Sequence, residues 1–153
     1  MHKNYIAGEW VAGETTIENR NPSDVTDIIG SYAQASTAQL DTAFEAARTA
    51  QKIWSRTGLE ARQTILMQIG NALMARAEEL GELLSREEGK PRAEGRGEVY
   101  RAGQFFTYYA AEVLRQIGDN ADSVRPDIEI DVRRDPVGVV AVVSPWNFPT
   151  ATA

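Results

Sequence analysis

The sequence contains no cysteine and only one histidine, His2. Within these residues the lack of cysteine excludes a thiol nucleophile, a disulfide, and any zinc site that needs cysteine or several histidines. A Ser-His-Asp triad would have to use His2, which lies at a terminus where chains tend to fray. We therefore expect neither a metal site nor such a triad. A chain without cysteine also fits a reducing compartment.

Positive charge is scarce as well, with 16 lysines and arginines against 22 aspartates and glutamates and a net charge of −6. Because nucleic-acid phosphates need a basic face, this predicts no nucleic-acid partner. The N-terminus lacks the apolar region of a signal peptide, and the longest apolar run, 137–143, is too short to cross a bilayer. We expect no membrane partner and a cytoplasmic protein of one domain.

The first 35 residues favour short strands and turns. Strands are expected at 5–6 and 10–11 around a glycine-containing turn, and a third at 28–33. The residues Asn19-Arg20-Asn21-Pro22-Ser23-Asp24 are typical of a turn.

Three amphipathic helices are expected next. Ser36 and Gln39 form a capping-box pattern, and the apolar stripe that follows (Leu40, Ala43, Phe44, Ala47, Trp54) predicts a helix to about residue 54. A second helix is expected over 59–87, with a break near Gly81, and it ends at Gly89-Lys90-Pro91. A third is expected over 93–117, with a buried face of Val99, Ala102, Gly103, Phe106, Ala110, Val113 and Ile117.

Two strands are expected near the end of the sequence. Residues 127–133 alternate charged and β-branched side chains, which predicts a strand with one buried face. Residues 137–143 are continuously apolar, which is typical of a strand buried on both faces of a parallel α/β sheet. Pro149 suits the first position of a helix.

The segment 144–149 lies where α/β proteins bind ligands, just beyond the carboxyl end of the predicted strand. Pro145 and Pro149 restrict the backbone on both sides of Asn147. An asparagine amide donates hydrogen bonds without a proton to lose, which suits an oxyanion rather than acid–base chemistry. The alternative is an Asx-type turn in which Trp146 and Phe148 only pack.

The segment Val142-Val143-Ser144-Pro145-Trp146-Asn147-Phe148-Pro149 resembles the catalytic-asparagine motif of the NAD(P)-dependent aldehyde dehydrogenase superfamily. The resemblance continues along nearly the whole chain, in order: Tyr5-Ile6-Ala7-Gly8-Glu9-Trp10, Asn21-Pro22-Ser23, Glu88-Gly89-Lys90-Pro91 and Asp135-Pro136-Val137-Gly138-Val139. It implies an α/β fold: an incomplete nucleotide-binding domain with part of a β oligomerisation arm.

The resemblance also implies a mechanism. In the family a cysteine thiolate attacks an aldehyde, an asparagine amide and the cysteine's own N–H stabilise the oxyanion, hydride passes to NAD or NADP, and a glutamate activates water. Asn147 matches the amide donor. Ser144, Pro145, Trp146 and Asn147 match the stretch beside the cofactor, and Phe148 matches a wall of the substrate tunnel.

The family's cysteine and glutamate have no counterpart among these residues. We therefore interpret the sequence as the N-terminal part of a longer enzyme, inactive alone and a homodimer or homotetramer when complete. Its expected divisions are 1–118, part of the cofactor-binding domain; 119–135, a strand of the oligomerisation arm; and 136–153, the start of the parallel sheet.

Residues 104–112 and 117–120 look most like bacterial 2-oxoglutarate semialdehyde (2,5-dioxopentanoate) dehydrogenases within that family. Arg101 matches a position facing the substrate tunnel, where a guanidinium can pair with the distal carboxylate of an acidic semialdehyde. The alternative for Arg101 is a solvated helix charge.

Other patterns favour structural roles. Gly95-Arg96-Gly97 follows no strand and is interpreted as a helix entry. The pairs Phe105/Phe106 and Tyr108/Tyr109 are expected in helix packing, and the acidic group Glu78, Glu79, Glu82, Glu87 and Glu88 on a solvated face. A second class of function stays open, a non-catalytic module that assembles through the strand at 127–133.

Overall fold

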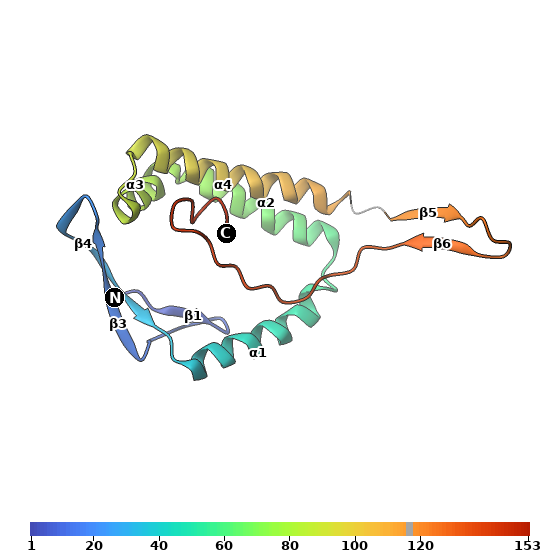
Figure 1. Ribbon diagram of the computed structural model, residues 1–153, viewed down its shortest axis with the longest axis horizontal. Coiled ribbons are helices and arrows are strands. Elements are labelled where there is room, and N and C mark those ends of the chain that lie inside the picture. Colours follow the sequence, from blue (N-terminus) through green and yellow to red (C-terminus); the bar gives the residue numbers. More distant parts are fainter. Residues whose placement is uncertain (116–117) are drawn as a thin grey trace.

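Four helices and three antiparallel hairpins make up the computed structural model, which describes residues 1–115 and 118–153 (Figure 1). The helices are α1 (Thr37–Trp54), α2 (Leu59–Ala75), α3 (Ala77–Glu88) and α4 (Arg92–Val113). The hairpins are β1 (Asn4–Ile6) with β2 (Glu9–Val11), β3 (Thr15–Asn21) with β4 (Asp24–Gln34), and β5 (Asp119–Asp122) with β6 (Glu129–Val132). The structure is therefore mixed α and β, as expected of a partial α/β domain.

Two helix ends follow local sequence rules. The Ser36 hydroxyl accepts a hydrogen bond from the N–H of Gln39 at 3.2 Å, and the Gln39 side chain accepts one from the N–H of Ser36 at 3.1 Å. The capping box predicted for α1 is thus confirmed. Helix α3 ends at Gly89, whose φ of 81° lies in the left-handed region, as expected of a C-cap glycine.

Replacing Gly89 is expected to destabilise the chain. A Gly89→Ala substitution retains φ near 81° only at a cost of about 1–2 kcal/mol, and its Cβ would lie 3.0 Å from Pro22 Cγ. Urea denaturation at neutral pH measures the loss in the free energy of unfolding. Gly97→Ala is the control, because Gly97 lies inside α4 with open space around its Cα and a φ outside the left-handed region. Equal effects of the two substitutions would contradict the explanation.

The break in the second predicted helix lies at Arg76, between α2 and α3, and not near Gly81. Gly81 is buried inside α3, where a Cβ would lie 2.5 Å from the Cα of Arg96 on α4. Gly81 thus allows close approach between helices rather than a break. The predicted end of the third helix, at residue 117, lies outside the described residues.

The buried core lies where α2, α3 and α4 meet, and it centres on Ala77, Leu84 and Val99. Helices α2 and α4 run side by side (Figure 1). They approach closely at Gly70, where a Cβ would lie 2.7 Å from the carbonyl oxygen of Gly103. The predicted buried face of the third helix is confirmed at Val99, Ala102, Gly103, Ala110 and Val113, while Phe106 is half-buried.

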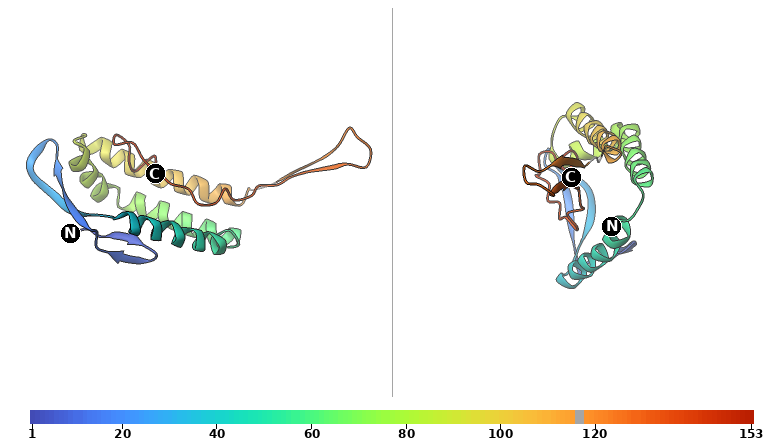
Figure 2. Two further views of the ribbon diagram at one scale, coloured as in Figure 1. Left: turned by 60° about the horizontal axis from the view of Figure 1, so that its bottom comes forward. Right: turned by 90° about the vertical axis from the view of Figure 1, so that its right-hand side faces the viewer.

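Much of the remaining apolar surface is uncovered. The chain exposes 11438 Å², whereas a compact monomer of its mass exposes about 7,700 Å². Helix α1 stands apart from α2 and α4 in the end-on view (Figure 2), and its predicted buried stripe is exposed at Leu40, Phe44 and Trp54. That expectation was wrong because the described residues provide no surface to cover the stripe.

The β3–β4 hairpin is fastened to α3 by polar contacts. Arg86 donates two hydrogen bonds to the carboxylate of Asp27, at 2.9 and 2.6 Å, and Glu87 accepts from Asn19 at 2.8 Å. The bonds from Arg86, followed by one from Asn21, hold the pKa of Asp27 below its ordinary value. The sequence predicted the turn around Pro22-Ser23 and, as its third strand, residues 28–33 of β4, but it did not predict β3.

The N-terminus is also held in place. The N–H of His2 donates to the carbonyl of Ser31 at 2.7 Å, and the imidazole stacks on Tyr32 with the ring centroids 4.6 Å apart. The expectation of a frayed end was therefore wrong, although His2 remains exposed and far in sequence from the candidate site.

The β5–β6 hairpin projects beyond the helices, at the end opposite the β3–β4 hairpin (Figure 2). The strand predicted at 127–133 is present as β6, but every residue of β5 and β6 is exposed, so the predicted buried face was wrong. Residues 137–143 form no strand and are all exposed. A strand needs a neighbouring strand to bond with, and within residues 1–115 and 118–153 none lies beside this segment.

Candidate functional site

After the β5–β6 hairpin the chain runs back below α2 and α4 to the C-terminus, and residues 144–149 belong to this returning stretch (Figure 1). Turns occupy 146–147 and 149–151, and the N–H of Thr152 donates to the carbonyl of Phe148 at 3.2 Å, so a single turn stands where Pro149 suggested a helix. Beyond it, residues 151–153 line a hollow together with Leu66, Phe105 and Tyr109. The residues that directly follow the predicted ligand segment thus lie beside the α2–α4 pair.

Two charged side chains tie this segment to the helices. Lys90 Nζ donates to the backbone carbonyl of Asn147 at 2.8 Å. The carboxylate of Glu98, on α4, accepts from the N–H of Thr150 at 2.9 Å and from that of Ala151 at 3.2 Å. Lys90 and Glu98 also pair with each other. The backbone on both sides of Phe148-Pro149 is thus held by the same ion pair.

Lys90 is charged in this environment. Burial lowers its pKa, but hydrogen bonds to Glu88 and Glu98 and the attraction of their charges outweigh burial and leave the pKa above its ordinary value. The ammonium also lies 4.6 Å from the centroid of the Phe148 ring, a cation–π contact. Phe148, predicted as a substrate wall, is half exposed.

The side chains predicted to bind the cofactor face outward. Trp146 is 87% exposed, Pro145 and Asn147 are exposed, and Ser144 is half-buried. The Ser144 hydroxyl and the Asn147 amide are groups that bind a ribose or a carboxamide. Gly95-Arg96-Gly97 provides no phosphate cradle, because Gly95 is packed inside α4 against Gly81 and Ser85. The residues Ser144–Asn147 are chemically suited to one wall of a dinucleotide site, but neither they nor residues 95–97 form a phosphate-binding loop.

Arg101 lies on the exposed face of α4, in a shallow hollow with Gln104, Phe105 and Tyr108. Within the described parts of the chain, its guanidinium makes no hydrogen bond or ion pair, and residues 144–149 do not line its hollow. The structure therefore does not bring Arg101 and Asn147 into one pocket.

Several secondary expectations need correction. Phe105, Tyr108 and Tyr109 are exposed rather than packed, because the described residues cover that face of α4 only in part, where residues 151–153 share a hollow with Phe105 and Tyr109. Glu87 and Glu88 are half-buried, whereas Glu78, Glu79 and Glu82 are exposed, and each of the five is hydrogen-bonded or paired with a basic or polar side chain. Among residues 1–115 and 118–153 there is no group of three potential metal-ligating side chains, and no helix long and apolar enough to cross a membrane.

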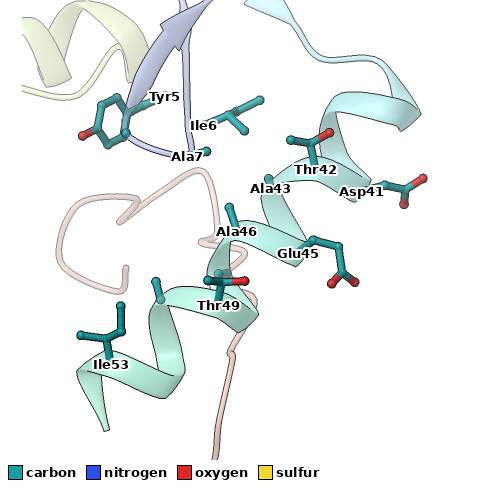
Figure 3. Close-up of a pocket in the computed structure, with 13 residues that line it drawn as sticks. Tyr5, Ile6, Ala7, Asp41, Thr42, Ala43, Glu45, Ala46, Thr49 and Ile53 are labelled. Atoms are coloured by element: carbon teal, nitrogen blue, oxygen red, sulfur yellow. The ribbon is translucent and has the colours of Figure 1, made fainter. Parts of the chain in front are cut away.

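A separate hollow lies between β1 and α1, and Figure 3 shows Tyr5 and Ile6 on one side and Ala43, Ala46 and Ile53 on the other. The carboxylates of Asp41 and Glu45 point away from Tyr5 (Figure 3). Because its facing surfaces are apolar and no polar groups converge there, the hollow is typical of a packing surface rather than an active site.

Glu98 is the residue of this site that the sequence interpretation missed. It lies on the buried face of α4, directly before Val99 and three residues after Gly95. A carboxylate on the apolar face of a helix has to be paired. The position of Glu98 on this apolar face could have predicted from the sequence that its carboxylate is paired. It could not have identified Lys90 or Thr150 as the partners.

The sequence profile described as the aldehyde dehydrogenase family matches residues 10–153. The chain belongs to the aldehyde dehydrogenase family. Its relatives within the family include the alpha-ketoglutarate semialdehyde dehydrogenase of Haloferax volcanii, 37% identical over 151 residues, which make up 97% of this chain and 31% of that protein. The alpha-ketoglutaric semialdehyde dehydrogenase of Bacillus subtilis is 40% identical over 152 residues, with the same coverage of 97% and 31%.

Solved aldehyde dehydrogenases share the fold. The enzyme from Brucella melitensis biovar abortus superposes with a TM-score of 0.94 at 33% identity, over 99% of this chain and 32% of that one. A betaine aldehyde dehydrogenase from Staphylococcus aureus, solved in complex with NAD⁺, has a TM-score of 0.91 at 28% identity, over 99% and 31%. The chain thus spans about a third of the length of these relatives.

Proposed function

We propose that these residues form the N-terminal part of an aldehyde dehydrogenase that oxidises an aldehyde to the carboxylate with NAD or NADP. The observation that carries the proposal is Asn147, in a segment that matches the family and whose backbone carbonyl is fixed by Lys90. The chain contains no cysteine that could act as the nucleophile, so we expect these 153 residues alone to be inactive.

In this proposal the Asn147 amide donates a hydrogen bond to the oxyanion that develops on the aldehyde carbon. A donor held in place before the reaction stabilises that charge without reorganisation at the moment of attack. The half-buried Ser144 and the exposed Pro145, Trp146 and Asn147 form one wall of the cofactor site, and Phe148 borders the substrate. The nicotinamide, when bound, supplies the acceptor for hydride.

An acidic semialdehyde is the proposed substrate class, with 2-oxoglutarate semialdehyde as the first candidate. The names of the Haloferax and Bacillus relatives support this choice. The exposed guanidinium of Arg101 is suited to a distal carboxylate, because its planar fork binds a carboxylate through two hydrogen bonds.

The test is cofactor reduction by the protein expressed from its complete reading frame. We expect aldehyde-dependent reduction of NAD⁺ or NADP⁺, with a higher kcat/KM for 2-oxoglutarate semialdehyde than for benzaldehyde. The 153-residue chain, assayed in parallel, is expected to show no turnover. Turnover by the short chain, or none by the complete protein with any aldehyde, would overturn the proposal.

Arg101→Met in the complete enzyme tests the substrate assignment. Loss of the guanidinium is expected to raise KM for acidic semialdehydes by at least about tenfold, the value of one charge-assisted hydrogen bond, and to leave KM for uncharged aldehydes nearly unchanged. Steady-state kinetics with both aldehyde classes measures the difference. Equal effects on both classes would assign Arg101 to a solvated helix charge.

The second candidate function is a non-catalytic module that assembles with other chains, and the fully exposed β5–β6 hairpin favours it. Unpaired strand edges readily bond to another chain. We propose that this hairpin contributes to a homodimer or homotetramer of a cytoplasmic enzyme. The intact mass of the native protein separates the candidates: a mass near 16.8 kDa favours a free-standing module, and a several-fold larger mass favours the enzyme.

A further inference from the structure

The burial of Glu98 is the starting point. Its side chain is 1% exposed on the apolar face of α4. A buried carboxylate costs several kcal/mol unless it is paired and hydrogen-bonded, so its position needs an explanation. Glu98 belongs neither to the apolar core between α2, α3 and α4 nor to the polar contacts that fasten the β3–β4 hairpin.

The bonds of Glu98 point to the candidate site. Oε2 pairs with Lys90, and Oε1 accepts both the N–H of Thr150 and that of Ala151. These two N–H groups lie immediately after Phe148-Pro149, so the carboxylate binds the start of the turn that follows the Asn147 segment. Within the described residues, Glu98 therefore bonds to Lys90 and to the turn that directly follows the Asn147 segment.

Lys90 completes the arrangement from the other side. Its ammonium has three donors, and the structure gives it three acceptors: the carboxylates of Glu88 and Glu98 and the carbonyl oxygen of Asn147. The side chain is 11% exposed, so water competes little for these bonds. The carbonyl of Asn147 is thus held by a charged donor that is itself fixed by two carboxylates.

We propose that Lys90 and Glu98 are positioning residues for Asn147. Lys90 holds the backbone carbonyl of Asn147, Glu98 holds the N–H groups of Thr150 and Ala151, and the exposed amide of Asn147 is thereby aimed at the reacting oxygen. The inference rests on the proposed function of Asn147. It explains how the backbone of an exposed turn obtains the rigidity that an oxyanion donor needs.

Glu98→Gln in the complete enzyme is the test. The amide cannot accept from Lys90 and from both N–H groups with the strength of a carboxylate, so the turn loosens. We expect kcat to fall by about ten- to a hundredfold, with KM for the aldehyde little changed. We also expect faster amide exchange at Thr150 and Ala151, a readout independent of activity. Glu94→Gln, an exposed glutamate one turn earlier on α4, is the matched control and is expected to change neither.

A double-mutant cycle separates positioning from general destabilisation. If Glu98 acts through Asn147, Glu98→Gln causes no further loss of kcat in an Asn147→Ala background. Glu98→Asp retains the negative charge that pairs with Lys90, and it is the variant to use if Glu98→Gln does not fold. We expect Glu98→Asp to lower kcat less than Glu98→Gln does, and to cause no further loss of kcat in the Asn147→Ala background. Losses that multiply, or an unchanged kcat in the Asn147 wild-type background, would overturn the inference.

The two proposals fail in different ways. If Asn147→Ala itself leaves kcat unchanged, the proposed function of Asn147 is wrong. If Asn147→Ala lowers kcat and the Glu98 variants do not, or if exchange at Thr150 and Ala151 is unaffected, only the positioning role is wrong.

Discussion

Asn147→Ala is expected to lower kcat of the complete enzyme by about 10²–10³-fold, the usual effect of removing one donor from an oxyanion hole. The amide is exposed and lies in a turn whose backbone is fixed by Lys90, so the substitution removes the donor and leaves the backbone contacts intact. Because the donor acts only as charge develops on the oxygen, KM is expected to change little. Steady-state rates of aldehyde-dependent cofactor reduction measure the effect.

Two further variants control this experiment. Asn147→Asp has nearly the shape of asparagine, but its carboxylate accepts and cannot donate, so it is expected to be at least as damaging as alanine. Asn71→Ala, on the exposed face of α2, is expected to leave kcat unchanged. Wild-type kcat in Asn147→Ala would assign the segment to packing alone, as in the Asx-turn interpretation.

Gly95→Ala and Gly97→Ala are expected to change stability in opposite directions, although both glycines lie in the first half of α4. A Cβ at Gly95 would collide with Ser85 Oγ and with the carbonyl of Gly81, and such overpacking costs about 1–3 kcal/mol. Gly97 has open space around it, and alanine is favoured over glycine in a helix by up to about 1 kcal/mol.

Urea denaturation of the two variants beside the wild-type chain measures this difference. Gly95→Ala should unfold at lower urea concentration than the wild type and Gly97→Ala at equal or higher concentration, with similar slopes. A stable Gly95→Ala variant would show that α3 and α4 can separate without cost, which would contradict the close contact at Gly81.

The sequence predicted features that depend on neighbouring residues. The capping box of Ser36 and the C-cap at Gly89 involve groups within a few residues of each other, and both were predicted correctly. The segment containing Asn147 was recognised because its residues are contiguous. The helix break at Arg76 was not found, because no glycine or proline marks it.

Features that depend on distant contacts were missed. Lys90 and Asn147 are 57 residues apart, and Glu98 and Thr150 are 52 apart, so no local pattern joins them. Residues 137–143 have the composition of a buried strand, but a strand forms only where a neighbouring strand accepts its backbone hydrogen bonds, and composition does not show whether one is there. The exposed stripe of α1 shows the same limitation: periodicity identifies an apolar face and not the surface that covers it.

The large exposed surface of the chain has a consequence for the temperature dependence of its stability. The heat capacity change of unfolding comes from newly exposed apolar surface, and an ordinary protein of this length would show about 2 kcal/mol/K. Here much of that surface, including 137–143 and the apolar stripe of α1, is in water before unfolding begins. The heat capacity change is therefore smaller, and the free energy of unfolding of these residues alone curves only weakly between its cold and hot limits.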